Sequence, residues 1–355
     1  MKHNFGAGPC ILPQEVFQEA SQAVLNFNGI GLSILEISHR SKEFEAVIAE
    51  TERLVRELLA VPQGHSILFL QGGASTQFAM VPLNLLPEGG KAAYLDTGTW
   101  ANKAIKEAKK VGETVVVASS ADANYSYIPS AYEIPADAAY FHYTSNNTIF
   151  GTEIFDTPKS TIPLVSDMSS DILSRKINVS DYGLIYAGAQ KNMGPAGVTL
   201  VIVKDELLGK TGRTLPTIFD YQSHIAAGSM YNTPPVFSIY VSMLNLRWLK
   251  SKGGVEVIEQ ENIIKARTLY EEIDRNPLFK GTAAPADRSR MNVTFVTEDK
   301  AHEAAFLELA KERGLIGLKG HRSVGGFRAS IYNALSITGV NALVDAMQEF
   351  EEKNK

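Results

Sequence analysis

The pattern of apolar and polar residues changes character along the chain. Residues 13–27 and 41–61 repeat apolar side chains at intervals of three and four, which predicts two amphipathic helices, and Ser41 is placed to cap the second. From residue 65 onward, short apolar runs alternate with helical stretches, a pattern that is typical of βαβ units. The sequence therefore predicts two helices followed by an α/β region.

The apolar runs of the middle region predict the strands of one large sheet. They are rich in β-branched and aromatic residues and lie at 66–70, 92–95, 114–119, 138–144, 162–167, 183–187 and 198–203. Continuous apolar runs are expected where a strand is buried on both faces. We therefore predict an α/β fold whose large domain has a mainly parallel sheet covered by helices.

A smaller unit is predicted after the glycine pair at 253–254, which separates two helical patterns. The following order is helix, strand, helix, strand and helix, at 255–276, 291–297, 302–314, 327–334 and 340–352. The expected large domain is 16–254. The expected small α+β domain combines 1–15, whose glycines and prolines indicate an irregular segment, with 255–355.

Composition narrows the class of protein. With 355 residues, 45% of them hydrophobic and 21% charged, the chain is typical of a soluble globular protein with a sizeable core. A net charge of -5 and scattered basic residues do not favour a nucleic-acid partner. The lone Cys10, and the lack of a signal pattern or an apolar run of membrane-spanning length, lead us to expect a cytoplasmic protein with no membrane partner.

Two local features point to chemistry. Lys191 stands between the strand patterns 183–187 and 198–203, where a lysine either reaches solvent or has a chemical role. Gly72 and Gly73 join the predicted strand 66–70 to a helical stretch, so that backbone N–H groups at a helix start could bind phosphate. An ordinary surface lysine and a plain glycine turn fit these local patterns equally well.

Asp167 directly follows a predicted buried strand, which places it at the carboxyl edge of the sheet, where α/β folds bind ligands. Capping of the next turn is its simpler role. An anion site, an acid and a lysine, each after a strand, are together what pyridoxal phosphate requires: a phosphate site, an acid facing its ring nitrogen, and an amine that forms a Schiff base. No metal site is predicted.

Several motifs in a fixed order extend this interpretation. They are NFGAGP, ISHRS, QGGAS, SDMSSD, GAQKNMGPAG and MYNTPP, and the match that they belong to runs from residue 4 to the C-terminal segment. In these motifs the chain resembles the phosphoserine aminotransferase family, which are class V pyridoxal-phosphate-dependent aminotransferases of fold type I. The resemblance implies that Lys191 bears the cofactor and acts as general base, and that Asp167 pairs with the pyridine nitrogen.

The resemblance also implies further cofactor contacts. Ala74, Ser75 and Gln190 match phosphate-binding positions, Trp100 matches the aromatic residue that stacks on the ring, and Thr148 matches a hydroxyl near the ring oxygen. Asn232 and Thr233 match a pair that the neighbouring subunit supplies, which implies a homodimer with shared active sites. From sequence alone Trp100 is equally compatible with a core position.

For the substrate, the resemblance implies two anion-binding segments. His39 with Arg40, and His321 with Arg322, resemble phosphate-recognising segments, for which histidine and arginine donors are suited. Arg328 lies where the family binds the α-carboxylate. A surface charge remains the alternative for either His-Arg pair, and an edge-strand charge for Arg328.

The implied reaction transfers the amino group between L-glutamate and 3-phosphooxypyruvate, giving O-phospho-L-serine and 2-oxoglutarate in serine biosynthesis. A phosphorylated hydroxythreonine analogue from pyridoxine biosynthesis would use the same contacts. Two alternatives remain open. A cysteine desulfurase shares the fold but needs a nucleophilic cysteine, and Cys10 is the only one here. The other is a non-catalytic phosphate-binding α/β protein with a structural lysine.

Overall fold

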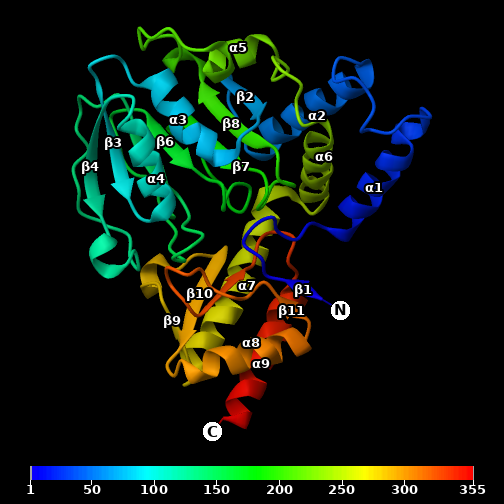
Figure 1. Cartoon of the computed structure of the whole chain (residues 1–355), viewed down its shortest axis with the longest axis vertical. Coiled ribbons are helices and arrows are strands. Elements are labelled where there is room, and N and C mark those ends of the chain that lie inside the picture. The colour runs from blue at the N-terminus through cyan, green and yellow to red at the C-terminus, as the bar shows by residue number, and fades with distance from the viewer. Residues whose placement is uncertain (1, 355) are drawn as a thin grey trace.

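A seven-stranded sheet forms the centre of the fold in this computed structural model, which describes residues 2–354 (Figure 1). Its strands are β2 (His65–Leu70), β3 (Lys91–Asp96), β4 (Glu113–Ser119), β5 (Phe141–Thr144), β6 (Leu164–Asp167), β7 (Leu184–Gly188) and β8 (Thr199–Lys204), in the order β2-β8-β7-β6-β5-β3-β4. Met1 and Lys355, which the expected small domain includes, lie outside the described residues. The predicted large, mainly parallel sheet is confirmed.

Strand β8 is the exception to the parallel arrangement, because it runs antiparallel to both β2 and β7. Only residues 189–198 connect β7 to β8, whereas a parallel crossover needs a dozen or more residues and usually a helix. The chain therefore turns back beside β7. Both β2 and β7 run antiparallel to β8, so they run in the same direction as each other, and β6 runs parallel to β7. The carboxyl ends of β2, β6 and β7 therefore lie at the same edge of the sheet.

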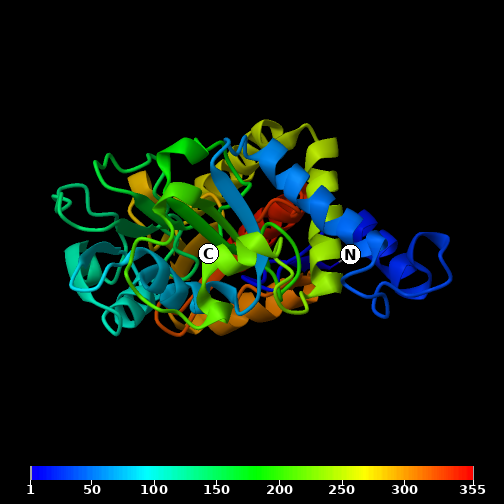
Figure 2. The same cartoon turned by 90° about the horizontal axis from the view of Figure 1, so that it is seen from above.

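Helices cover both faces of this sheet. On one face lie α3 (Gly73–Leu85), α4 (Thr99–Ala108) and α5 (Tyr221–Ala226), and on the other lie α1 (Gln14–Leu25), α2 (Lys42–Leu58) and α6 (Val236–Ser251). Neighbouring strand residues alternate between the two cores: Ile67 packs with α2 and α6, and Leu68 packs with α3. Figure 2 shows α2 and α6 together on one side of the sheet. As predicted, Ser41 caps α2, and its Oγ accepts a hydrogen bond from Phe44 N at 3.4 Å.

A second core lies around a three-stranded antiparallel sheet with the order β12 (Phe327–Ser330), β10 (Asn292–Thr297) and β9 (Phe279–Gly281). The helix α7 (Gly254–Arg275) leads into it, and α8 (Ala301–Glu312) and α9 (Ile337–Lys353) pack against it. The predicted strand 327–334 ends at Ser330, because the next residues turn and direct their carbonyl groups toward α7.

The N-terminal segment is more ordered than its glycines and prolines predict. Strand β1 (His3–Asn4) pairs in parallel with β11 (Leu315–Ile316), and Phe5 lies in the second core (Figure 1). The first residues of the chain are thus fixed against its last hundred. Among the described residues, no helix is both long enough and apolar enough to cross a membrane.

Candidate active site

A cavity of about 340 Å³ opens at the carboxyl edge of the large sheet. Its lining comes from the ends of several strands, from the first turns of α3 and α4, and from the second core. The lining residues are Ala7, Gly8, Gly73, Ala74, Ser75, Trp100, Thr144, Asn146, Thr148, Ile149, Asp167, Ser169, Ser170, Gln190, Lys191, His321 and Arg328. The structure therefore brings together nine of the residues that the sequence singled out.

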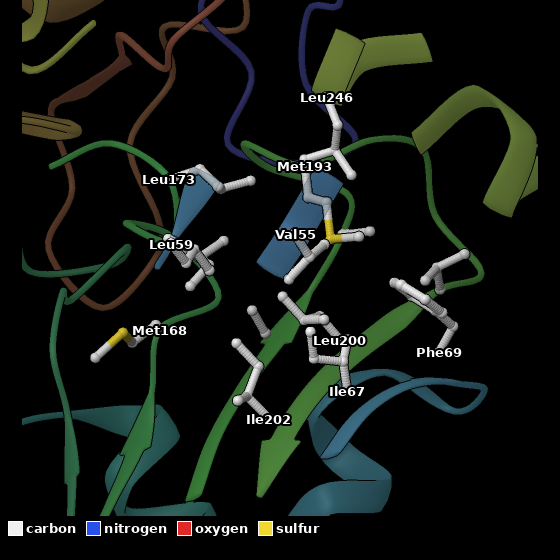
Figure 3. Close-up of a cluster of buried hydrophobic side chains, with 14 of the residues drawn as sticks. Val55, Leu59, Ile67, Phe69, Met168, Leu173, Met193, Leu200, Ile202 and Leu246 are labelled. Atoms are coloured by element: carbon white, nitrogen blue, oxygen red, sulfur yellow. The ribbon is translucent and has the colours of Figure 1, made fainter. Parts of the chain in front are cut away.

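Lys191 lies on the loop between β7 and β8, and its side chain enters this cavity. Met193, two residues later, is buried in the core beside Val55 of α2 and Leu246 of α6, and this anchors the loop (Figure 3). Lys191 Nζ donates a hydrogen bond to Thr148 Oγ1 at 2.6 Å. Burial lowers the pKa of Lys191 to about 8, although the charge of Asp167 opposes the shift. A lysine with this pKa supplies neutral amine near neutral pH.

Asp167 is the last residue of β6, and only 4% of its surface is exposed. Its Oδ1 accepts a hydrogen bond from Ser169 N at 2.9 Å. Burial raises the pKa of Asp167, while hydrogen bonds from Ser169 and the charge of Lys191 act in the opposite direction. A buried carboxylate facing the cavity is suited to a cationic partner.

The first turn of α3 forms one wall of the cavity through Gly73, Ala74 and Ser75. Gly72 and Gly73 have φ values of 90° and 66°, and a Cβ on Gly72 would collide with Thr76 Oγ1. The turn therefore requires glycine. The first N–H groups of a helix have no intrahelical acceptor and carry partial positive charge, which makes this wall suited to bind a phosphate.

Trp100 lies on the first turn of α4 and faces the cavity. Its Nε1 is buried and has no hydrogen-bond partner among the described residues, and Lys103 Nζ lies 4.6 Å from its ring centroid. Gln190 lines the wall beside Lys191, and Thr148 lies opposite as the partner of the lysine. Trp100 thus presents an aromatic surface and an unused donor to a bound molecule.

Two basic side chains enter the cavity from the segment of the second core that includes β12. Arg328 on β12 donates from Nη1 to the Thr148 carbonyl at 3.1 Å, whereas its Nε is buried without a partner among the described residues. Burial lowers the pKa of Arg328. His321 also lines the cavity, and its pKa is lowered by burial and then by the charges of Arg328, Arg322 and Lys103. An anion would relieve this crowding of positive charge.

Five predicted site residues lie outside this cavity. Arg322 follows His321 but does not line the wall, and His39 and Arg40 lie on a partly exposed loop before α2. Asn232 lines a separate cavity of about 230 Å³ with Gly72 and Thr76, on the far side of the α3 start. The Thr233 carbonyl accepts a hydrogen bond from Gln71 Nε2 at 2.8 Å. Within one chain, these residues do not complete the site.

Sequence reasoning missed several residues of the wall. Ala7 and Gly8 belong to the NFGAGP motif, but small residues give no chemical signal of their own. A Cβ on Gly8 would lie at an ordinary contact distance, 3.5 Å, from side-chain atoms of Gln190 and Lys191, and the φ of 140° is what favours glycine there. Ser169 and Ser170 follow Asp167 closely, and that spacing was the available signal.

Comparison with known proteins identifies the family. The family model Aminotransferase class-V matches residues 3–343. The chain belongs to the class-V aminotransferase family. Phosphoserine aminotransferases from Flavobacterium johnsoniae and Bacteroides thetaiotaomicron are 64% and 60% identical to it over 353 residues, with 99% of both chains covered in each case.

Solved structures agree with this class-V assignment. A phosphoserine aminotransferase from Bacillus circulans subsp. alkalophilus has a TM-score of 0.97 at 44% identity, covering 100% of this chain and 99% of its own. The pyridoxal-phosphate-bound phosphoserine aminotransferase from Trichomonas vaginalis has a TM-score of 0.94 at 40% identity, covering 98% and 100%. The predicted fold type, aminotransferase class and cofactor are thereby confirmed.

The residues of the cavity fit pyridoxal phosphate. The start of α3 offers donors for the phosphate, Asp167 offers a carboxylate for the ring nitrogen, Trp100 offers a surface for stacking, and Lys191 offers an amine. When bound, the cofactor supplies an electron sink for the bond that breaks at the substrate Cα. Membership of the class-V aminotransferase family argues against the alternative of a non-catalytic phosphate-binding protein.

The cysteine desulfurase alternative requires a reactive thiolate, and Cys10 is unsuited to that role. Its Sγ donates to the Lys191 carbonyl, and burial raises its pKa to about 12. Its backbone N–H donates to the Gln190 carbonyl at 3.1 Å. Cys10 thus holds the N-terminal segment against the lysine loop as a thiol.

Proposed function

We propose that this chain transfers the amino group between L-glutamate and 3-phosphooxypyruvate, producing O-phospho-L-serine and 2-oxoglutarate. The observation that carries the proposal is one cavity holding Lys191 together with two basic side chains, Arg328 and His321. Both substrates carry two anionic groups, so basic side chains on the substrate side of the lysine match them. The relatives named phosphoserine aminotransferase support the same substrates.

Lys191 is proposed as the general base. In the first half-reaction, its Nζ takes the proton from the Cα of the amino-acid substrate. In the second half-reaction, Nζ gives a proton to the Cα of the amino-acid product. Thr148 Oγ1, which accepts a hydrogen bond from Nζ, orients the amine. Asp167 holds a proton on the ring nitrogen of the cofactor, and Trp100 excludes water from one face of the site.

Arg328 is proposed to bind the substrate α-carboxylate through its fork of N–H donors. Its bond to the Thr148 carbonyl fixes the guanidinium beside the partner of Lys191, which orients the Cα toward the amine. His321 and Arg322, on the loop before β12, are proposed to bind the second anion of the substrate, the phosphate.

Four of the five residues outside the cavity support a homodimer with shared sites. His39, Arg40, Asn232 and Thr233 are proposed to reach the cofactor and substrate of the neighbouring subunit. Exposed apolar side chains lie on the same segments: Leu32 and Leu35 precede His39, with 46% and 62% of their surfaces exposed, and Tyr231 precedes Asn232. A second copy of the chain would cover them.

Subunit mixing tests the shared site. Arg40→Ala and Lys191→Ala proteins, each inactive alone, are unfolded, mixed in equal amounts and refolded. If Arg40 acts across the interface, each mixed dimer has one intact site, and about a quarter of the wild-type activity returns. Mixing two Lys191 variants is the control. No recovery from the Arg40 and Lys191 mixture would contradict the proposal.

Substrate choice is tested by turnover with 3-phosphooxypyruvate, with hydroxypyruvate, and with the phosphorylated keto acid of the hydroxythreonine series. We expect the unphosphorylated compound to be far slower, and parallel double-reciprocal plots for glutamate against the keto acid. Borohydride reduction should attach the cofactor to Lys191. Equal rates with and without the phosphate would refute the anion-binding assignment of His321 and Arg322.

Two further proposals concern organisation. Residues 16–254 are proposed to form the cofactor-binding domain, and 1–15 with 255–355 the small domain; the separate apolar cores support this division. The enzyme is also proposed to work in the cytoplasm, where the thiol of Cys10 stays reduced. Limited proteolysis near the Gly253–Gly254 junction and cell fractionation test these points.

A further inference from the structure

A group of three charged side chains lies buried behind Asp167 and outside the cavity lining. Glu153, Asp171 and Arg175 have 2%, 3% and 8% of their surfaces exposed. Arg175 Nε lies 3.5 Å from Glu153 Oε1, and Arg175 Nη2 lies 3.5 Å from Asp171 Oδ2. Two carboxyl groups thus share one guanidinium, which leaves an uncompensated negative charge if both are ionised.

Arg175 does not direct its best hydrogen bonds to these acids. Its Nη1 and Nη2 donate to the carbonyl groups of Phe155 and Ile154, each at 3.1 Å. The longer contacts of Arg175 with Glu153 and Asp171 are therefore charge interactions. Protonation of one of these acids removes its charge interaction and leaves the hydrogen bonds of Arg175 intact. This geometry favours a state in which the pair of carboxyl groups carries one proton.

Ser145 connects this group to Asp167. Its Oγ lies 2.5 Å from Asp171 Oδ1 and 3.0 Å from the Asp167 carbonyl oxygen. A hydroxyl has a single proton and can donate it to one of these oxygens only. If Asp171 is protonated, it donates to Ser145 Oγ, and Ser145 Oγ donates to the Asp167 carbonyl, which also accepts a hydrogen bond from Ser145 N at 3.0 Å.

The charges that face the two acids agree with a retained proton. Burial and then Asp167 raise the pKa of Asp171, while Arg175, Ser145 and Lys191 act against the shift. Burial and then Asp171 raise the pKa of Glu153, while Arg175 and Arg290 act against it. Arg290 N also donates to Glu153 Oε2 at 2.7 Å.

We propose that Glu153 and Asp171 hold one shared proton, and that this proton positions the Asp167 end of β6 through Ser145. The three residues are positioning residues, because none lines the cavity. The inference rests on the proposed function in one respect only, the role of Asp167 toward the cofactor ring. With the proton in place, the group behind Asp167 is neutral overall, so Asp167 keeps its own negative charge without a second one beside it.

The test is infrared difference spectroscopy of the full-length holoenzyme between pH 5 and pH 8, following the carbonyl stretching band of a protonated carboxyl group. We expect the wild type to lose such a band as the pH rises. Asp171→Asn and Glu153→Gln should each remove it, because the remaining acid then pairs with Arg175 and ionises. Asp181→Asn, at an exposed position, is the control and should keep it. A band that persists in both variants, or is absent from the wild type, would overturn the proposal.

A second measurement is the urea midpoint of unfolding across the same pH range. The pKa of each acid is raised on folding, so the stability that it contributes is present at low pH and is lost progressively as the pH rises from the unfolded pKa, about 4, to the raised folded pKa. The fall in midpoint should be smaller in Glu153→Gln and Asp171→Asn than in wild type and Asp181→Asn. Equal falls in all four would overturn the shared proton. Neither readout depends on turnover, so a wrong substrate assignment would leave both results unchanged.

Discussion

Lys265 on α7 offers a direct test of what holds the strand of Arg328 in place. Only 2% of Lys265 is exposed, and its Nζ donates to the carbonyl oxygens of Ile331, Tyr332 and Leu335 at 2.9, 2.8 and 3.0 Å. These carbonyls lie in the turn that directly follows β12. All three ammonium protons are therefore used to fix this turn.

The substitution Lys265→Met keeps the length of the side chain and removes the three donors. The Tyr332 carbonyl keeps a hydrogen bond from Leu335 N at 2.9 Å, whereas the Ile331 and Leu335 carbonyls lose the lysine donor. Each buried carbonyl left without a partner costs about 1–3 kcal/mol, and the relief of burying a charge offsets part of the sum. We expect a net loss of about 2–4 kcal/mol in the free energy of unfolding. A loss of this size is a large part of the stability of an ordinary domain. Lys265→Gln retains two donors and should lose less.

Urea unfolding of the holoenzyme, followed by circular dichroism, measures these changes. Lys252→Met is the matched control, because Lys252 is exposed just after α6, and it should change stability by less than about 0.5 kcal/mol. If Lys265→Met were as stable as the control, the three hydrogen bonds would contribute no net stability. The reasoning from unsatisfied carbonyl groups would then be wrong.

Three further predictions concern the site. Lys191→Ala should lower kcat by at least about 100-fold in steady-state assays, because it removes the general base; a smaller effect would assign the base elsewhere. Since the pKa of Lys191 is lowered to about 8, the neutral amine of the apoprotein should increase roughly tenfold between pH 7 and pH 9. Its rate of attachment to added pyridoxal phosphate should rise with it and then level off, whereas a rate still rising steeply above pH 10 would indicate an ordinary lysine. Arg328→Lys should raise the KM for glutamate by roughly 10- to 100-fold through loss of the paired N–H donors, and an unchanged KM would remove Arg328 from the carboxylate site.

The centre of the site is predictable because strand order determines it. In a mainly parallel sheet, residues that follow different strands meet at one edge, however far apart they are in sequence. Asp167 after β6, Lys191 after β7, and Ala74 and Ser75 after β2 all follow this rule. The rule applies even though β8 is antiparallel, because β8 lies between β2 and β7, and those two strands run in the same direction.

The contributions from outside the sheet were not predictable by such a rule. Arg328 reaches Thr148 across 180 positions of sequence, and only the packing of the second core brings them together. Ala7 and Gly8 line the wall of the cavity as small residues, and no periodic pattern in the sequence predicts that position. The family resemblance supplied the role of Arg328, whereas it gave Ala7 and Gly8 none.

The pairing of the two ends of the chain has a consequence for folding during synthesis. Phe5 N donates to the Ile316 carbonyl at 2.8 Å, Ser330 N donates to the Phe5 carbonyl at 3.1 Å, and Tyr332 Oη donates to the Ala7 carbonyl at 2.9 Å. Contacts that span more than 300 residues close a very long loop and form late. During synthesis, these contacts of Phe5 and Ala7 form only after residues 316–332 have been made. The wall that Ala7 and Gly8 form beside Lys191 is therefore completed after the strands that flank Lys191 have been made.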